Sequence, residues 1–130
     1  MLLSRKQFKE QVFKRSKGRC VFCSDQAVDA HHILERKLFP DGGYYLDNGA
    51  AVCEKHHLDC ERTIISVEAV REACGITNVI LPPGFEAFYV YDKWGNIEKF
   101  DGTRKPGPLF HDTGCRKSLI AGRVIGLFIL

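Results

Sequence analysis

Cysteine and histidine residues between positions 20 and 57 lie at spacings that suit metal binding. One pair of candidate ligands occupies 20–23 as Cys-x-x-Cys, and a second pair occupies 53–56 as Cys-x-x-His. Two ligands separated by two residues share one ion through a tight turn, and two such turns complete the tetrahedron that zinc prefers. The fourth ligand could instead be Cys60 or His57. The expected ligands of this structural zinc are Cys20, Cys23, Cys53 and His56.

Three further histidines in the same stretch, His31, His32 and His57, are not needed for that zinc. Imidazole nitrogens bind divalent metals, and an imidazole with a pKa near neutrality can accept a proton from water. These residues indicate a second, open site of a catalytic kind. Glu61 follows His57 by four residues, which on a helix places both on one face and makes Glu61 a further candidate ligand. A salt bridge from Glu61 to Arg62 or another basic neighbour is an equally good interpretation.

The six cysteines fit metal ligation better than a disulfide framework. The first ten residues hold no apolar run of the length found in secretion signals. No stretch approaches the roughly 20 apolar residues of a membrane span. We therefore expect a cytoplasmic protein with no membrane partner. Cys60, Cys74 and Cys115 then remain as thiols, and their lack of Cys-x-x-Cys pairing argues against a redox or zinc-sensing role.

Positive charge is concentrated at the start of the chain. The net charge is only +3, but residues 1–19 hold seven basic residues and a single acid, Glu10. A basic arm on a near-neutral body suits a nucleic-acid backbone, in a contact that is independent of sequence and weakened by salt. A solvated helix face would explain the same charges equally well. The candidate nucleic-acid contacts are Arg5, Lys6, Lys9, Lys14, Arg15 and Lys17.

Short elements of both kinds are expected around these residues. Ser4 and Gln7 form a capping-box pattern at the start of a basic helix, and Ser66 and Gly75 bracket another helix. The expected elements are a helix over 4–17, strands over 27–33 and 50–53, a helix from His56 onward, a helix over 67–74, a strand over 85–91, a hairpin tip at 94–96 and irregular structure over 101–115.

The segment from Cys20 to Glu61, about a third of the chain, resembles the zinc-containing branch of the HNH, or ββα-metal, endonucleases. It departs from the family pattern at His56, where a cysteine is usual, and at His31, where aspartate is frequent. Both replacements keep the ability to bind metal. The resemblance is carried, in order, by Cys20-x-x-Cys23, His31-His32, Gly42-Gly43, Asn48 and Cys53-x-x-His56-His57.

This resemblance implies a metal-dependent endonuclease that hydrolyses phosphodiester bonds, most readily those of DNA, and leaves 5′-phosphate and 3′-hydroxyl ends. His32 would be the general base, and Asn48 would fix the loop that orients it. His31 and His57, with Glu61 as a further ligand, would hold a catalytic Mg²⁺ or Mn²⁺. A bacterial cytoplasm, or that of a phage-infected cell, is the expected location.

The implied fold is α+β: a ββα-metal motif stapled by a Cys3His zinc site, with a basic N-terminal helix. Residues 1–76 would form this core, and residues 77–130 would form a C-terminal extension packed on it. The apolar tail, 119–130, could form a surface for a protein partner, but packing on the core is the commoner explanation of such a tail. The sequence predicts no particular oligomeric state.

Two other functions compete with this one. The first is a zinc-stabilised module that binds nucleic acid without cleaving it. The second is an accessory domain of an RNA-processing or ligase system, with RNA as the substrate. Residues 85–130 contain KWGN at 93–96 and GPLF at 107–110. Over this short stretch they resemble segments that join such zinc domains to RNA-ligase-like proteins of phage and bacteria.

Overall fold

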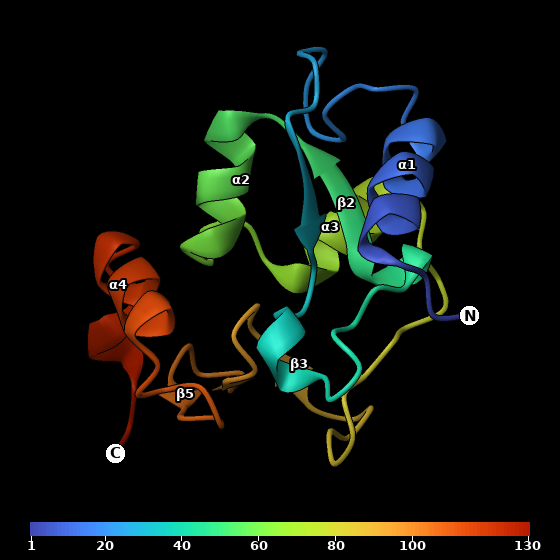
Figure 1. Ribbon diagram of the computed structural model, residues 1–130. Helices are drawn as coiled ribbons and strands as arrows, with labels where there is room; N and C mark the ends of the chain where they lie inside the picture. Colours follow the sequence, from blue (N-terminus) through green and yellow to red (C-terminus); the bar gives the residue numbers. More distant parts are fainter.

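The computed structural model describes residues 1–130 as an α+β arrangement in which two small sheets are packed among four helices (Figure 1). None of these helices combines the length and the apolar composition that crossing a bilayer requires. The helices are α1 (Arg5–Arg15), α2 (Glu54–Glu61), α3 (Val67–Cys74) and α4 (Thr113–Ala121). The strands are β1 (Asp29–His32), β2 (Gly49–Val52), β3 (Val90–Tyr91), β4 (Ile97–Glu98) and β5 (Arg104–Lys105).

Helix α1 confirms the helix expected at the N-terminus. The Ser4 hydroxyl accepts the N–H of Gln7, and the Gln7 side chain accepts the N–H of Ser4, so both bonds of the capping box are present. Phe8 and Val12 form the buried face of the helix. This face packs so closely on β2 that a Cβ added to Gly49 would lie 2.5 Å from the Val12 side chain. The sequence of α1 therefore fixes its basic side chains close to the first sheet.

Strands β1 and β2 form an antiparallel pair in which His31 lies opposite Ala50 and His32 lies opposite Gly49. Because this sheet has two strands only, the outer edge of β1 has no strand partner. Helix α1 lies on one side of the pair and α2 lies on the other (Figure 1). Successive side chains of a strand point to opposite faces, so the two adjacent histidines face different helices.

Helices α2 and α3 follow β2 directly. Helix α2 begins at Glu54, two residues before the expected start, because the acidic Glu54 suits a first turn and nothing in 54–56 breaks a helix. Helix α3 has the expected bounds. The Ser66 hydroxyl accepts the N–H of Ala69, and Gly75 ends the helix with a φ of 70°, a left-handed conformation that suits glycine.

The C-terminal half differs from expectation in two places. The strand expected over 85–91 is reduced to Val90–Tyr91, because Pro82-Pro83-Gly84 and a turn at residues 86–89 keep the preceding chain out of the sheet. Irregular structure was expected over 101–115, but the end of that segment begins α4, whose first turn is capped by the Asp112 carboxylate. The hairpin expected at 94–96 is confirmed, since β3 and β4 pair on either side of it.

The main core does not divide at residue 76. It gathers Leu34, Val52 and Val70 from the first part of the chain and also Tyr91 from β3. A second, smaller cluster joins Trp94 to Cys115 and Leu119 of α4. Residues 77–130 thus share buried surface with the segment that holds the candidate ligands.

Candidate functional site

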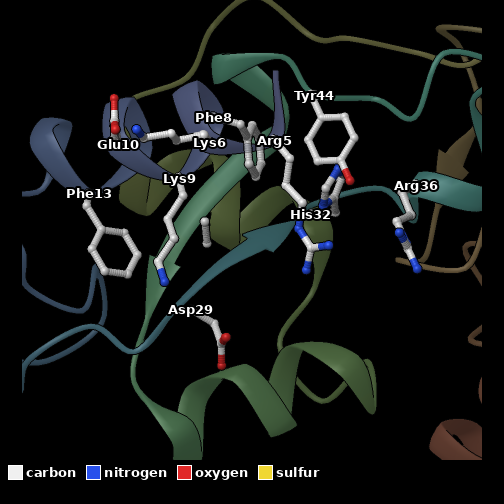
Figure 2. Close-up of a pocket in the computed structure, with 11 residues that line it drawn as sticks. Arg5, Lys6, Phe8, Lys9, Glu10, Phe13, Asp29, His32, Arg36 and Tyr44 are labelled. Carbon is white, nitrogen blue, oxygen red and sulfur yellow. The ribbon is translucent and has the colours of Figure 1, made fainter. Parts of the chain in front are cut away.

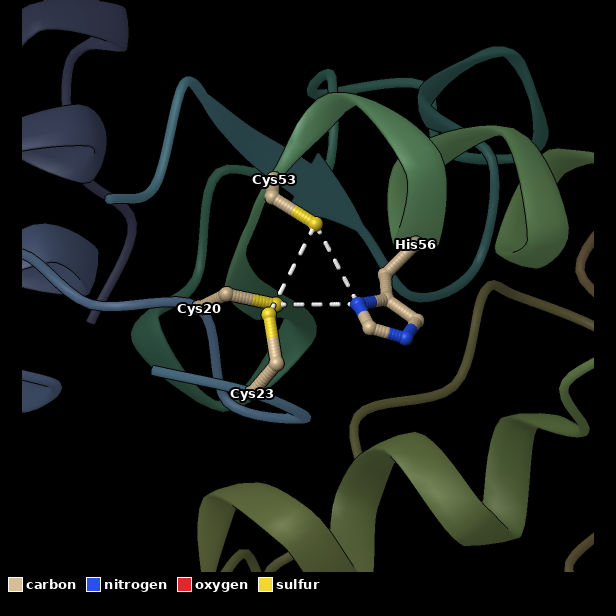
Figure 3. Close-up of side chains that lie close together, drawn as sticks. All are labelled: Cys20, Cys23, Cys53 and His56. Carbon is tan, nitrogen blue, oxygen red and sulfur yellow. Dashed lines mark hydrogen bonds between the residues drawn. The ribbon is translucent and has the colours of Figure 1, made fainter. Parts of the chain in front are cut away.

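Cys20, Cys23, Cys53 and His56, which we call the Cys3His cluster, bring their ligand atoms within 4.8 Å of one another (Figure 3). The Cys23 and Cys53 sulfurs are 3.9 Å apart, and His56 Nδ1 lies 3.4 Å from Cys20 Sγ and 3.2 Å from Cys53 Sγ. Zinc bond lengths in a tetrahedron give edges of about 3.8 Å between two sulfurs and about 3.5 Å between sulfur and nitrogen. The cluster could therefore hold a metal ion such as zinc.

Local hydrogen bonds prepare Cys20 to act as a ligand. The backbone N–H of Phe22 donates to Cys20 Sγ at 3.5 Å. Burial acts to raise the pKa of the Cys20 thiol, but hydrogen bonds from the backbone of Cys53 and Phe22 and from the side chains of Cys23 and His56 together lower it to about 7. The thiolate is the form that binds metal. Of the alternatives for the fourth ligand, neither Cys60 nor His57 belongs to this cluster.

The remaining cysteines are buried or half-buried and unreactive. Burial raises the pKa of Cys60 and that of Cys115 to about 12, and it raises the pKa of Cys74 as well. These thiols stay protonated at neutral pH, whereas a redox-active cysteine needs a lowered pKa and access to solvent. Their environments give no support to a redox role.

His31, His57 and Glu61, which we call the His–Glu cluster, lie together between β1 and α2, with their ligand atoms within 4.8 Å of one another. Glu61 Oε1 is 3.0 Å from His57 Nε2 and 3.9 Å from His31 Nδ1. His31 is almost completely buried, and its Nδ1 has no hydrogen-bond partner. An unpaired polar atom in the interior is costly, and a divalent ion held by the three side chains would satisfy it. The donor set of two imidazoles and one carboxylate fits such an ion.

Electrostatics favour the metal-binding forms of His31 and Glu61, whereas they favour the protonated form of His57, which would have to release a proton to bind an ion. Burial is the main cause that lowers the pKa of His31 well below its ordinary value, so the ring is neutral. Burial alone would raise the pKa of Glu61, but the hydrogen bond from His57 and the Lys93 ammonium lower it to about 2. The same bond to Glu61 is the main cause that raises the pKa of His57, and Asp29, 3.1 Å from His57 Nδ1, adds to it. Glu61 is therefore ionised at neutral pH, and its partners are His57 and Lys93, not Arg62.

His32 points away from this cluster, toward α1. Its ring stacks on Phe8 with centroids 4.7 Å apart and meets Tyr44 edge-on at 4.9 Å. His32 Nε2 lies 3.1 Å from the carbonyl oxygen of Gly42. A carbonyl only accepts, so Nε2 carries the proton and Nδ1 holds the free lone pair. Burial, followed by the charge of Lys93, lowers the pKa of His32 to about 4. The ring is therefore neutral at pH 7, but it is a weaker base than the near-neutral imidazole expected from the sequence.

Asn48 holds the loop that positions His32. The Asn48 side chain is buried, accepts the N–H of Leu34 at 3.0 Å, and donates to the carbonyls of Leu34 at 3.1 Å and Gly43 at 3.2 Å. Gly43 follows Gly42, whose carbonyl accepts from His32. Both glycines have positive φ values, 87° and 67°. Asn48 thus clamps the two ends of the loop that reaches the His32 ring.

His32 borders a groove of about 880 Å³ that lies between α1 on one side and β1 with the segment that follows it on the other (Figure 2). Four basic residues line it, and none of them forms an ion pair. Asp29 also lines it and connects it to His57 of the His–Glu cluster. We call this surface the basic groove. Its cationic residues are Arg5, Lys6, Lys9 and Arg36.

The other basic residues of the N-terminal segment are placed differently. Lys14 and Lys17 do not line the basic groove. Arg15 turns inward, where its guanidinium donates to the carbonyls of Leu46, at 2.9 Å, and Gly49. This corrects the expectation that Arg15 offers its charge to a ligand. Arg15 follows Phe8 by seven residues, so it lies on the buried face of α1 and ties the helix to β2.

Three residues at the site were not identified from the sequence. Asp29 lies two residues before His31, and the period of a strand could have placed both on one face. Arg36 follows the histidine pair closely, but only the fold turns it into the basic groove. Lys93 reaches Glu61 at 3.4 Å from far along the chain, and no local pattern predicts that contact. No protein-family model, curated protein or solved structure matches this chain.

Proposed function

We propose that this protein is a metal-dependent endonuclease of the HNH type that cleaves nucleic acid, with DNA as the main substrate. One observation carries the proposal. A neutral imidazole with a free Nδ1, that of His32, borders a groove of unpaired cations, and a cluster of metal-ligand type lies on the other face of the same strand.

The geometry of β1 explains how these two parts would serve one phosphodiester. His31 and His32 are adjacent, so one faces α2 and the other faces α1. The outer edge of β1 has no strand partner. A phosphate lying along this edge would have His32 on one side and the His–Glu cluster on the other. Asp29 already spans the distance between the basic groove and His57.

Each residue has a role in this mechanism. His32 accepts a proton from the attacking water at Nδ1, while its Nε2–H bond to Gly42 keeps the ring in place. Asn48 maintains that bond through the loop. His31, His57 and Glu61 would hold a Mg²⁺ or Mn²⁺ ion. When bound, the ion supplies a Lewis acid that stabilises charge on the phosphate and on the leaving 3′ oxygen. The products would carry 5′-phosphate and 3′-hydroxyl ends.

The remaining features fit this activity. A zinc ion in the Cys3His cluster would brace the junction of β2 and α2, from which His57 and Glu61 project. The basic groove offers charge without a row of base-reading side chains, which suits contact with the phosphate backbone and weak sequence preference. The alternatives remain a zinc module that binds nucleic acid without cleaving it and an accessory domain acting on RNA.

A nicking assay tests the proposal. Supercoiled plasmid and single-stranded RNA are each incubated with the protein and Mg²⁺ or Mn²⁺, with an EDTA control. We expect DNA nicking that needs the divalent ion, and we expect His32→Ala to lower its rate by about 10² to 10⁴, the usual contribution of a general base. His111→Ala is the matched control, because His111 is exposed and lies outside both clusters.

The zinc content and the thermal midpoint of each variant are measured in the same preparations. A His32→Ala protein that keeps its zinc and its fold but cuts at the rate of the His111→Ala protein would overturn the base assignment. Binding of plasmid without any cleavage by the unaltered protein would favour the non-catalytic zinc module. Cleavage of RNA alone would favour the RNA-processing role.

A further inference from the structure

Lys93 is a buried lysine in the hairpin between β3 and β4, in a part of the chain to which the sequence assigns no function. Its side chain is 4% exposed. Its ammonium lies 2.8 Å from Glu35 Oε2 and 3.4 Å from Glu61 Oε2. Burying a lysine costs several kcal/mol unless partners compensate it. Here two carboxylates do so, and one of them belongs to the His–Glu cluster.

The hairpin is anchored to the site by more than this one ammonium. The backbone N–H of Glu35 donates to the carbonyl of Lys93 at 3.0 Å. The indole N–H of Trp94 donates to the backbone carbonyl of Glu61 at 2.8 Å. The Lys93 ammonium also lies 4.6 Å from the centre of the Trp94 ring. Lys93 therefore has a fixed position relative to the end of α2, where Glu61 lies.

The two oxygens of Glu61 have different surroundings. Oε2 faces Lys93 at 3.4 Å. Oε1 faces the cluster, 3.0 Å from His57 Nε2 and 3.9 Å from His31 Nδ1. A free carboxylate can bind a metal through one oxygen or both, and it can rotate between the two arrangements. With Oε2 held by an ammonium, only Oε1 is presented to an ion beside the histidines.

We propose that Lys93 is a positioning residue of the cleavage site, which holds Glu61 so that it offers a single oxygen to the divalent ion. The inference rests on the proposed function, because it takes the His–Glu cluster as the seat of that ion. It also gives residues 77–130 a role, since this segment completes the site by supplying Lys93. Outer partners that orient a ligand typically change metal affinity by about 10- to 100-fold when they are removed.

The test uses a variant that removes the ion pair without changing the net charge. Lys93→Met alone would leave Glu35 buried without its partner, so it is combined with Glu35→Leu. Replacing a buried ion pair by apolar residues of similar size is often tolerated. Loss of the Lys93 ammonium, 3.4 Å from Glu61, also removes a positive charge that repels a cation, so charge alone would strengthen Mn²⁺ binding. Weaker binding in the variant would therefore report the lost orientation of Glu61. Lys99→Met is the matched control, because Lys99 is exposed and makes no side-chain contact with the cluster.

Mn²⁺ is titrated into zinc-loaded full-length protein, and the free ion is followed by electron paramagnetic resonance. We expect one Mn²⁺ site in the unaltered protein, unchanged affinity in Lys99→Met, and affinity weaker by about 10- to 100-fold in Lys93→Met/Glu35→Leu. Zinc content and thermal midpoint are measured alongside. Lys93→Arg keeps the charge and its reach to Glu61, so it should retain affinity close to that of the unaltered protein.

The outcomes separate this inference from the proposed function. Equal Mn²⁺ affinity in the unaltered and the doubly substituted proteins would overturn the role of Lys93 and leave the cleavage site standing. Absence of any Mn²⁺ site in the unaltered protein would overturn the proposed function itself. Should the doubly substituted protein fail to fold, a Lys93→Arg protein that keeps its fold but binds Mn²⁺ ten times more weakly would count against the proposal.

Discussion

Asn48 is the residue whose removal should show most directly how the fold supports the site. Asn48→Ala deletes three hydrogen bonds from a side chain that is 1% exposed. The Gly43 carbonyl keeps a partner, because it also accepts from the N–H of Tyr45 at 2.9 Å. The N–H and carbonyl of Leu34, which is fully buried, lose the partner that Asn48 provides.

The expected loss of stability follows from these two orphaned groups. Each buried polar group left without a partner costs about 1–3 kcal/mol. We therefore expect Asn48→Ala to lower the free energy of unfolding by about 4 kcal/mol, a large share of the roughly 5–15 kcal/mol typical of a domain. With a urea m-value of about 2 kcal/mol per molar, the unfolding midpoint would fall by about 2 M.

Urea unfolding followed by tryptophan fluorescence measures this change, since Trp94 is the single tryptophan and is buried. Asn78→Ala is the control. Asn78 is exposed and has one side-chain contact, to Asp47 at 3.4 Å, so its loss should stay within about 0.5 kcal/mol. Asn48→Asp keeps the acceptor for Leu34 but places a carboxylate against two carbonyl oxygens, and it should be at least as damaging as the alanine. A loss below about 1 kcal/mol in Asn48→Ala would refute the view that Asn48 clamps this loop.

Two further predictions concern the metal and the charges. A zinc ion bound at the Cys3His cluster would contribute about 10–16 kcal/mol, as structural zinc does in small domains, so its removal by a strong chelator should unfold the protein. A circular dichroism spectrum that is unchanged after complete loss of the metal would contradict this. Lys6→Gln and Lys9→Gln should each flatten the dependence of log affinity on log salt by about 0.9 if each contacts one phosphate of duplex DNA. Lys117→Gln is the control, because Lys117 is exposed on α4, and it should leave the slope unaltered. If Lys6→Gln and Lys9→Gln also leave the slope unaltered, the basic groove binds no phosphate.

The features that the sequence predicted correctly depend on neighbouring residues. Helix α3 has the predicted bounds because Ser66 and Gly75 act through hydrogen bonds within one turn. Each half of the Cys3His cluster is a tight turn that brings two ligands together locally, and the paired spacing predicted that the two turns, 30 residues apart, would meet. Such features are encoded within a few residues and can be read without knowing the fold.

The features that were missed depend on contacts between distant segments. Lys93 meets Glu35 across 58 residues, and the charge pattern of the chain gives no sign of that pairing. Aromatic residues at 85–89 resemble those of a strand, yet Phe88 is 75% exposed, because the chain there turns instead of pairing. Arg15 is the exception: its spacing from Phe8 and Val12 already placed it on the buried face of α1. The period of the α-helix, applied to Arg15 as it was to Phe8 and Val12, would have predicted its inward position.

Helix α2 links the two clusters, because it carries ligands for both. His56 Nδ1 belongs to the Cys3His cluster, while the next residue, His57, belongs to the His–Glu cluster together with Glu61 one turn later. Consecutive helical residues point about 100° apart, so a helix held at its first turn by one ion would also set the direction of the ligands for another. The opposite end of α2 is held by Trp94 and Lys93, which bond to the backbone and the side chain of Glu61. The geometry of the proposed cleavage site thus depends on restraints at both ends of one eight-residue helix, one supplied by the Cys3His cluster and the other by the C-terminal hairpin.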